Sequence, residues 1–241
     1  MTTIAILGPE HSQSWQAAAQ FAPAAAIRAY PHVRDLLAAF DAHLADYAIL
    51  PVYNTREGEK KQSFRLFDQI RTGFWIDNIL LQGNLSLGVF DEGTTIGDLQ
   101  LLIGQREVFI QCEEFIEERV PGITEMSVQD VARAVAGIRQ GGDTVGRAVI
   151  DSPGALAALG LRVIERELAP HNRTRYAVLG HTLAEATGYD ATTLITEPLD
   201  DRVGLLVDIL GEFSRRGISI IDMRAENDIK TQKLRIYLEA E

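Results

Sequence analysis

The chain of 241 residues has a formal net charge of -11 and a pI near 5.0, which argues against nucleic acid or an anionic membrane as its main partner. Its length fits one large domain or a domain with a small appendage, and its composition, 46% hydrophobic and 24% charged, is that of an ordinary globular protein. The single cysteine, Cys112, excludes an internal disulfide framework and a Cys-rich metal site, and favours the cytoplasm. We expect no signal peptide or membrane span, because the start is not basic and no apolar run reaches about 18 residues.

Alternating strands and helices are predicted over the first 180 residues, which is typical of an open α/β sheet. The first strand runs into Gly8 and Pro9, and a helix follows from Ser12, so backbone N–H groups at its start are placed to receive an anion. A second cap is expected at Ser152, with Pro153 in the first helical turn, and a weaker one at Ser127 with Asp130. The predicted strands cover 3–7, 47–52, 99–104, 147–151, 162–169 and 174–180, and the predicted helices cover 12–22, 33–44, 63–70, 107–120, a segment from 127, and 152–160.

The stretch from 74 to 90 is apolar and partly alternating, as a strand pair or an extended crossover would be. Residues 181–190 are predicted to be a linker. Beyond them the pattern predicts a compact β-α-β-β unit, with strands over 191–198, 219–226 and 233–241. Its helix over 204–217 carries an apolar stripe that must pack on a sheet, formed by Leu205, Leu206, Ile209, Leu210 and Phe213.

Five ordered motifs resemble those of prephenate dehydratase followed by an ACT regulatory domain. "GPEHSQSWQAA" resembles the family's Gly-Pro-Glu-Gly-Thr-Phe-Ser opening, and "ILPVYNTREGE" resembles its Pro-Ile-Glu-Asn-Ser segment followed by Glu-Gly. "QC" matches the helix of the family's central lobe, and "VIDSPGALAALGL" matches its Ala-Ser-x-x-Ala-Ala segment. "NRTRYAVLG" matches the Asn-x-Thr-Arg-Phe signature, which is the most specific of the five.

The resemblance implies a two-lobed, periplasmic-binding-protein-like α/β domain over residues 1–180 with the substrate between the lobes. Lobe 1 is expected at about 1–78 and 168–180 and lobe 2 at about 79–167, with chain crossings near 75–80 and 165–170. A partial, ferredoxin-like ACT unit is expected over 191–241. The implied reaction is the loss of water and carbon dioxide from prephenate to give phenylpyruvate, on the way to phenylalanine, with no metal or organic cofactor.

The implied site places Thr174 as the hydroxyl that assists the leaving group and Arg175 as the cation that holds a carboxylate. Further ligand contacts are expected from two loops and a cap, namely Asn54, Thr55, Ser12, His11 and Ser152, although Ser152 equally suits a pure helix cap. Because side chains alternate along a strand, Thr174 and Arg175 cannot both face the ligand in an extended segment, so a local bend or loop conformation at Thr174 is predicted.

Several residues depart from the motifs. The family's Gly-Thr-Phe is His11-Ser12-Gln13 here, and the Glu of its Pro-Ile-Glu-Asn-Ser segment is Tyr53. Two alternatives to the dehydratase therefore stay open: an enzyme that decarboxylates prephenate or acts on a modified prephenate, and a non-catalytic sensor of aromatic amino acids.

The C-terminal unit departs as well. The effector motif Gly-Ala-Leu reads "VGLL", which leaves Gly204 and Leu205 as candidate effector contacts, and no Glu-Ser-Arg-Pro motif is present. A half sheet leaves an unpaired strand edge, so we expect either a truncation or a homodimer in which the C-terminal units make contact. The predicted partners are thus a small-molecule substrate, an aromatic amino acid effector and a second copy of the chain, without nucleic acid or membrane.

Overall fold

A computed structural model of the protein describes every residue except 11, 62, 64–71, 200–201 and 228–230. The chain forms two compact units, Met1–Thr182 and Leu183–Glu241. The predicted helix over 63–70 falls mostly outside the described residues. Among those that are described, no helix has the length and apolar character that crossing a membrane requires.

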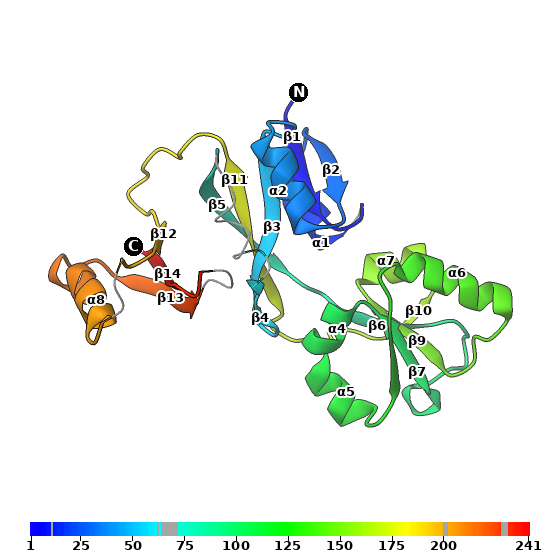
Figure 1. Ribbon diagram of the computed structural model, residues 1–241. Helices are drawn as coiled ribbons and strands as arrows, with labels where there is room; N and C mark the ends of the chain where they lie inside the picture. The colour runs from blue at the N-terminus through cyan, green and yellow to red at the C-terminus, as the bar shows by residue number, and fades with distance from the viewer. Residues whose placement is uncertain (11, 62, 64–71, 200–201, 228–230) are drawn as a thin grey trace. The chain divides into compact units, whose positions relative to one another are not determined.

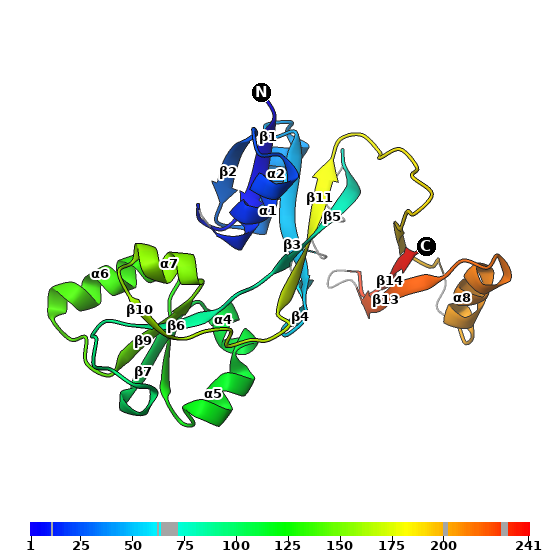
Figure 2. The same ribbon diagram turned by 180° about the vertical axis from the view of Figure 1, so that it is seen from behind.

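The first unit is built on two sheets (Figures 1 and 2), which confirms the two-lobed α/β expectation. Its strands are β1 (Thr3–Leu7), β2 (Ala26–Tyr30), β3 (Tyr47–Asn54), β4 (Gly58–Glu59), β5 (Phe74–Gln82), β6 (Ser86–Val89), β7 (Leu101–Gly104), β8 (Thr124–Ser127), β9 (Arg147–Asp151), β10 (Arg162–Glu165) and β11 (Arg173–Gly180). Its described helices are α1 (Gln13–Phe21), α2 (Val33–Asp41), α4 (Arg106–Gln111), α5 (Glu113–Arg119), α6 (Val131–Gly141), α7 (Pro153–Ala158) and the short 3-10 helix η1 (Ile96–Asp98).

The first lobe's sheet has the order β2-β1-β3-β11-β5, with β4 paired to β3. Strands β1, β2 and β3 run parallel, whereas β11 is antiparallel to both of its neighbours. The buried residues Ala17 and Ala18 of α1 pack on one face of this sheet, and Leu36 and Phe40 of α2 pack on the other. The last strand of the first unit, β11, thus lies between β3 and β5, and its Thr-Arg-aromatic segment lies beside the end of β3.

The second lobe's sheet has the order β10-β6-β9-β7-β8. On one face the core includes Phe109, Cys112 and Phe115 from α4, α5 and the residue between them. On the other face Val135 of α6 and Leu156 of α7 cover the strands. The helix predicted over 107–120 is divided at Cys112, whose backbone leaves the helical conformation with φ -101° and ψ 12°.

Two neighbouring segments join the lobes (Figures 1 and 2). The chain leaves the first sheet only after Gln82, later than the expected crossing near 75–80, because β5 pairs with β11 from Phe74 to Gln82. The outgoing and returning segments are tied by Gly83 N–H to Asn172 O and by Leu168 N–H to Leu85 O, both at 2.9 Å. The two crossings therefore form one hydrogen-bonded ribbon.

The helix caps follow the sequence signals with one correction. Ser12 caps α1 by accepting from Trp15 N–H, and Ser152 caps α7 by accepting from Ala155 N–H. The helix predicted from Ser127 begins only at Val131, because Ser127 ends strand β8 and the side chain of Asp130 is the cap. A carboxylate at the cap position accepts the N–H of Arg133 directly, which outweighs the weaker Ser-x-x-Asp pattern.

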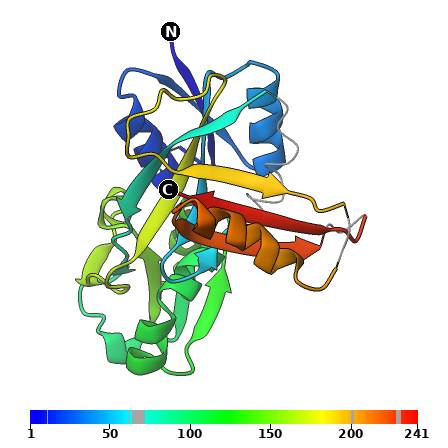
Figure 3. The same cartoon turned by 90° about the vertical axis from the view of Figure 1, so that its left-hand side faces the viewer.

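The second unit has the predicted β-α-β-β order: β12 (Thr192–Thr196), α8 (Leu205–Arg215), β13 (Ile220–Asn227) and β14 (Leu234–Ala240). Its sheet has the order β12-β14-β13, all antiparallel (Figure 3). The predicted apolar stripe of α8 is half-buried along its length, while the central strand β14 is buried from Ile236 to Ala240.

Candidate functional site

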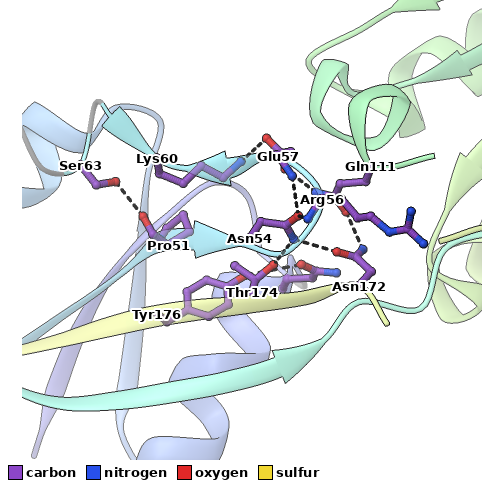
Figure 4. A network of polar contacts seen from close by, with 11 residues as sticks. Pro51, Asn54, Arg56, Glu57, Lys60, Ser63, Gln111, Asn172, Thr174 and Tyr176 are labelled. Atoms are coloured by element: carbon purple, nitrogen blue, oxygen red, sulfur yellow. Dashed lines mark hydrogen bonds and ion pairs between the residues drawn. The ribbon is translucent and has the colours of Figure 1, made fainter. Parts of the chain in front are cut away.

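Asn54, the last residue of β3, is fully buried, and its side chain makes four hydrogen bonds to described residues (Figure 4). Its Oδ1 accepts the backbone N–H groups of Arg56 and Glu57 at 2.8 and 3.1 Å. Its Nδ2 donates to Asn172 Oδ1 at 2.7 Å and to Thr174 Oγ1 at 2.8 Å. Backbone N–H groups can only donate, so they fix which end of the Asn54 amide points to Thr174.

The hydroxyl of Thr174 is therefore an acceptor toward Asn54. Thr174 lies opposite Asn54 in the β3–β11 ladder and is 4% exposed. A hydroxyl has one hydrogen and two lone pairs, so the bond from Asn54 occupies one lone pair and leaves the hydrogen available for another group. The arrangement orients Thr174 as a hydrogen-bond donor.

From Asn172, two residues before Thr174, a chain of hydrogen-bonded side chains continues into the second lobe (Figure 4). Asn172 Nδ2 donates to Gln111 Oε1 at 2.7 Å, and Gln111 Nε2 donates to Glu57 Oε1 at 2.5 Å. Glu57 also pairs with Lys60 at 2.5 Å, and its backbone N–H returns to Asn54. The ring of contacts closes on itself, so Gln111 of α4 stabilises the first-lobe residues that hold Thr174.

Arg56 makes a second connection between the lobes. Its guanidinium contacts Glu114 Oε2 of α5 at 2.7 Å and donates to Pro170 O at 2.7 Å. Both partners lie outside the first sheet, one in the second lobe and one in the returning crossing. Arg56 thus links the loop after β3 to both of them.

Arg175 lies on the other face of β11 from Thr174. Its guanidinium carbon is 5.4 Å from the centroid of the Trp75 ring, and its neighbour Ala177 packs with Val52. The bend predicted at Thr174 is not there, since Thr174 pairs regularly with β3 and β5; the register shifts against β3 only between Arg175 and Tyr176. The role of Arg175 as a carboxylate contact stays a prediction.

The other predicted contacts have structural roles of their own. Thr55 Oγ1 donates to His171 O and accepts from Arg173 N–H, both at 2.9 Å, which occupies its hydroxyl on the backbone before β11. The hydroxyls of Ser12 and Ser152 cap α1 and α7. His11 is outside the described residues. Ligand contacts by these residues remain predictions.

Two titratable side chains near this network are shifted by burial. Removal from water raises the pKa of the Tyr176 phenol, which also hydrogen-bonds to Ser14. The same cause raises the pKa of the Cys112 thiol, next to Gln111, to about 12. Both groups are therefore neutral near pH 7. Neither the Cys112 thiol nor the Tyr176 phenol adds a negative charge to the site.

A small open pocket lies at the start of α8 in the second unit, where Gly204 has a φ of +88°. It includes both predicted effector contacts, and its lining residues are Arg202, Gly204, Leu205, Leu206, Val207 and Leu234. Arg202 is paired with Asp208 at 2.5 Å. The pocket brings Gly204 and Leu205 together, while an effector there stays a prediction.

Asn172, Gln111 and Glu57 are not among the site residues predicted from the sequence. Each stands inside a quoted motif, in "NRTRY", "QC" and "YNTREGE", but their mutual contacts span 61 and 54 residues of sequence. The available signal was the presence of amide side chains inside the motifs, because an amide that becomes buried requires hydrogen-bond partners. Which amide meets which depends on how the lobes meet.

Comparison with known proteins identifies a family. A family model described as prephenate dehydratase matches residues 4–183. A curated relative from Neisseria gonorrhoeae (strain ATCC 700825 / FA 1090), a bifunctional chorismate mutase/prephenate dehydratase, is 29% identical over 223 residues. That match covers 90% of this chain, and the chain spans about 60% of the relative's length.

Solved structures show the same fold. A prephenate dehydratase from Arthrobacter aurescens in complex with L-Phe is similar with a TM-score of 0.83 and 23% identity, covering 99% of this chain and 80% of that one. GqqA, described as a novel type of quorum quenching acylase, is similar with a TM-score of 0.77 and 19% identity, covering 99% and 87%. Because one fold carries both descriptions, the chemistry must be argued from the site.

Proposed function

The chain belongs to the prephenate dehydratase family, and we propose that it converts prephenate to phenylpyruvate, water and carbon dioxide for the biosynthesis of phenylalanine, as a lyase of the hydro-lyase type. The C4 hydroxyl leaves as water with one proton taken up from the solvent, and the electron pair of the bond to the ring carboxylate closes the aromatic ring as carbon dioxide departs. Aromatisation drives the reaction, so the protein supplies mainly orientation and hydrogen bonds.

The observation that carries the proposal is the orientation of Thr174. Because Asn54 Nδ2 donates to Thr174 Oγ1 at 2.8 Å, the hydroxyl hydrogen of Thr174 can be directed to the departing oxygen of the substrate. A threonine hydroxyl is a weak acid, so its contribution is a hydrogen bond that strengthens as negative charge develops on that oxygen. Asn54, Asn172 and Gln111 act as positioning residues for this hydroxyl.

The remaining parts of the proposal concern regulation and assembly. An aromatic amino acid is proposed as an effector at the pocket of Gly204 and Leu205, with support from the L-Phe complex of the Arthrobacter aurescens enzyme. A homodimer that uses the C-terminal units is proposed because both outer strands, β12 and β13, have an unpaired edge among the described residues. We place the enzyme in the cytoplasm, where its buried Cys112 stays reduced.

The test is product formation from prephenate with the purified protein. Phenylpyruvate, read by its absorbance in alkali, is expected to form far faster than in the uncatalysed reaction. Mass spectrometry of the product distinguishes the alternatives: a product that keeps the ring hydroxyl means decarboxylation without dehydration. Binding of phenylalanine without any turnover of prephenate would instead identify a sensor and reject the dehydratase.

A further inference from the structure

Gln13 and Tyr176 both differ from the family's motifs, and their side chains are in contact in the structure. The opening motif has Phe at the place of Gln13, and the Asn-x-Thr-Arg-Phe signature has Phe at the place of Tyr176. Although 163 residues apart, they come within hydrogen-bonding range, with Tyr176 Oη 3.5 Å from Gln13 Oε1. Where the family pattern places two aromatic rings, this chain has a phenol and an amide in contact.

Tyr176 is the buried partner of this pair. It lies two residues after Thr174 on the same face of β11, and only 2% of it is exposed (Figure 4). Its ring packs with Ile4, Ile6 and Ile49 under α1, so its hydroxyl reaches the first turn of that helix. The raised pKa keeps the phenol protonated and able to donate to Gln13.

In the contact with Tyr176, Oε1 is the end of the Gln13 amide that faces the phenol. Since Oε1 accepts from the phenol, Nε2 points the other way, toward Gly83 in the outgoing crossing. A Cβ built on Gly83 would lie 3.0 Å from Gln13 Nε2 and 2.6 Å from Asn172 Nδ2. Two side-chain NH₂ groups therefore converge beside a glycine that leaves room for them.

This convergence adjoins the proposed catalytic hydroxyl. Asn172 is bonded to Asn54, and Asn54 to Thr174, so Gln13 Nε2 extends the same row of donors. Asn172 already donates to Gln111, whereas Gln13 is half-buried and its Nε2 donates to none of the described residues. A donor that is held by a buried anchor and has no acceptor among the described residues fits a ligand oxygen.

We propose that Gln13, oriented by Tyr176, is a specificity-determining residue that donates a hydrogen bond to a carboxylate or carbonyl oxygen of the substrate. This rests on the proposed function, since prephenate offers two carboxylates and a keto group as acceptors. An aromatic ring at position 13 would offer only an apolar surface there. Tyr176 is the positioning residue, because it acts on the substrate only through Gln13.

The experiment compares Gln13→Leu, Tyr176→Phe and the double variant in steady-state turnover of prephenate. For Gln13→Leu we expect KM to rise about tenfold, the size of one lost hydrogen bond to a charged group, with kcat changed less than twofold. For Tyr176→Phe we expect a smaller rise in KM. In the Gln13→Leu background, Tyr176→Phe is expected to raise KM no further, because the amide that Tyr176 orients is gone.

Gln16→Leu is the matched control, since Gln16 is exposed on the same helix and loses the same amide. Melting temperatures of all variants identify any loss of folding, and Gln13→Asn tests whether a shorter amide restores part of the affinity. Wild-type KM in Gln13→Leu, or additive effects of the two changes, would overturn the proposal while leaving the dehydratase intact. A wild-type protein with no turnover would overturn both.

Discussion

The guanidinium of Arg56 and the carboxylate of Glu114 lie 2.7 Å apart although 58 residues separate them, and the pair joins the loop after β3 to the second lobe. Their side chains are 27% and 64% exposed, so the pair contributes little to global stability. The pair instead stabilises the relative position of the lobes, and through it we expect the pair to affect substrate affinity.

Arg56→Met is therefore expected to raise KM for prephenate severalfold while the melting temperature changes by no more than a few degrees. The effect should shrink at high ionic strength, where the wild-type pair is itself screened. Initial-rate kinetics at low and high salt check this. Exchange of the charges in Arg56→Glu with Glu114→Arg should recover part of the affinity, and a KM equal to wild type in the single variant would contradict the role.

Thr174→Val removes the hydroxyl while keeping a side chain of the same shape. We expect kcat to fall about 100-fold or more with little change in KM, because the lost hydrogen bond is made mainly as the hydroxyl departs. Thr174→Ser should retain a large share of the activity. A valine variant as active as the wild type would remove Thr174 from the mechanism.

Asn54→Asp separates the direction of the hydrogen bond from its presence. The carboxylate still accepts from the N–H groups of Arg56 and Glu57, but its second oxygen now requires Thr174 to donate. Turnover should therefore fall at least tenfold although the fold persists. Urea unfolding of Asn54→Asp checks that the fold persists. In the same measurement, the unfolding free energy of Asn54→Ala is expected to fall by about 1–3 kcal/mol for each group that the change leaves buried and unpaired.

Gly83→Ala places a methyl group where Gln13 and Asn172 converge. The Cβ would meet Asn172 Nδ2 at 2.6 Å, so the amide must move and its bonds to Gln111 and Asn54 must lengthen. A large loss of kcat/KM is expected. Gly93→Ala is the control, because a Cβ there has no atom within 4 Å among the described residues; equal activity of the two variants would show that the amides tolerate displacement.

Cys112 should behave as an inert thiol in the native state. Burial raises its pKa from 9.0 to about 12, so thiolate-directed reagents at pH 8 are expected to label it only as fast as the protein unfolds. Because the folded state holds the proton more tightly, this contribution to stability is complete below pH 9 and lost between about pH 9 and 12. In Cys112→Ala the unfolding free energy should depend less on pH in that window; rapid labelling of native protein would contradict the burial.

Much of the fold follows from local patterns. The caps at Ser12 and Ser152 and the β-α-β-β order of the second unit could be predicted, because each rests on side chains near in sequence. The N-cap of α6 is three residues later than the sequence pattern predicts, because Asp130 and not Ser127 is the cap. The first crossing was placed too early because the pairing of β5 with β11 depends on a strand about 100 residues further along the chain.

The site was predicted only in part. Thr174 and Asn54 stood in recognisable motifs, and the structure brings their side chains together. The predicted bend at Thr174 was wrong, because the strand stays regular there and leaves Arg175 beside Trp75. The chain of hydrogen bonds through Gln111 and the contact of Gln13 with Tyr176 could not be predicted, since each joins elements whose proximity is a property of the completed fold.

The place of β11 between β3 and β5 also determines the order in which the molecule can form during synthesis. Strand β5 leaves the ribosome about 100 residues before the strand that pairs with it, a delay of roughly 5–20 s at ordinary translation rates. The second lobe, continuous from Ser86 to Glu165, can finish folding in that interval. The nascent chain therefore exposes the edges of β3 and β5, which are open to pairing with another chain, until Gly180 has emerged.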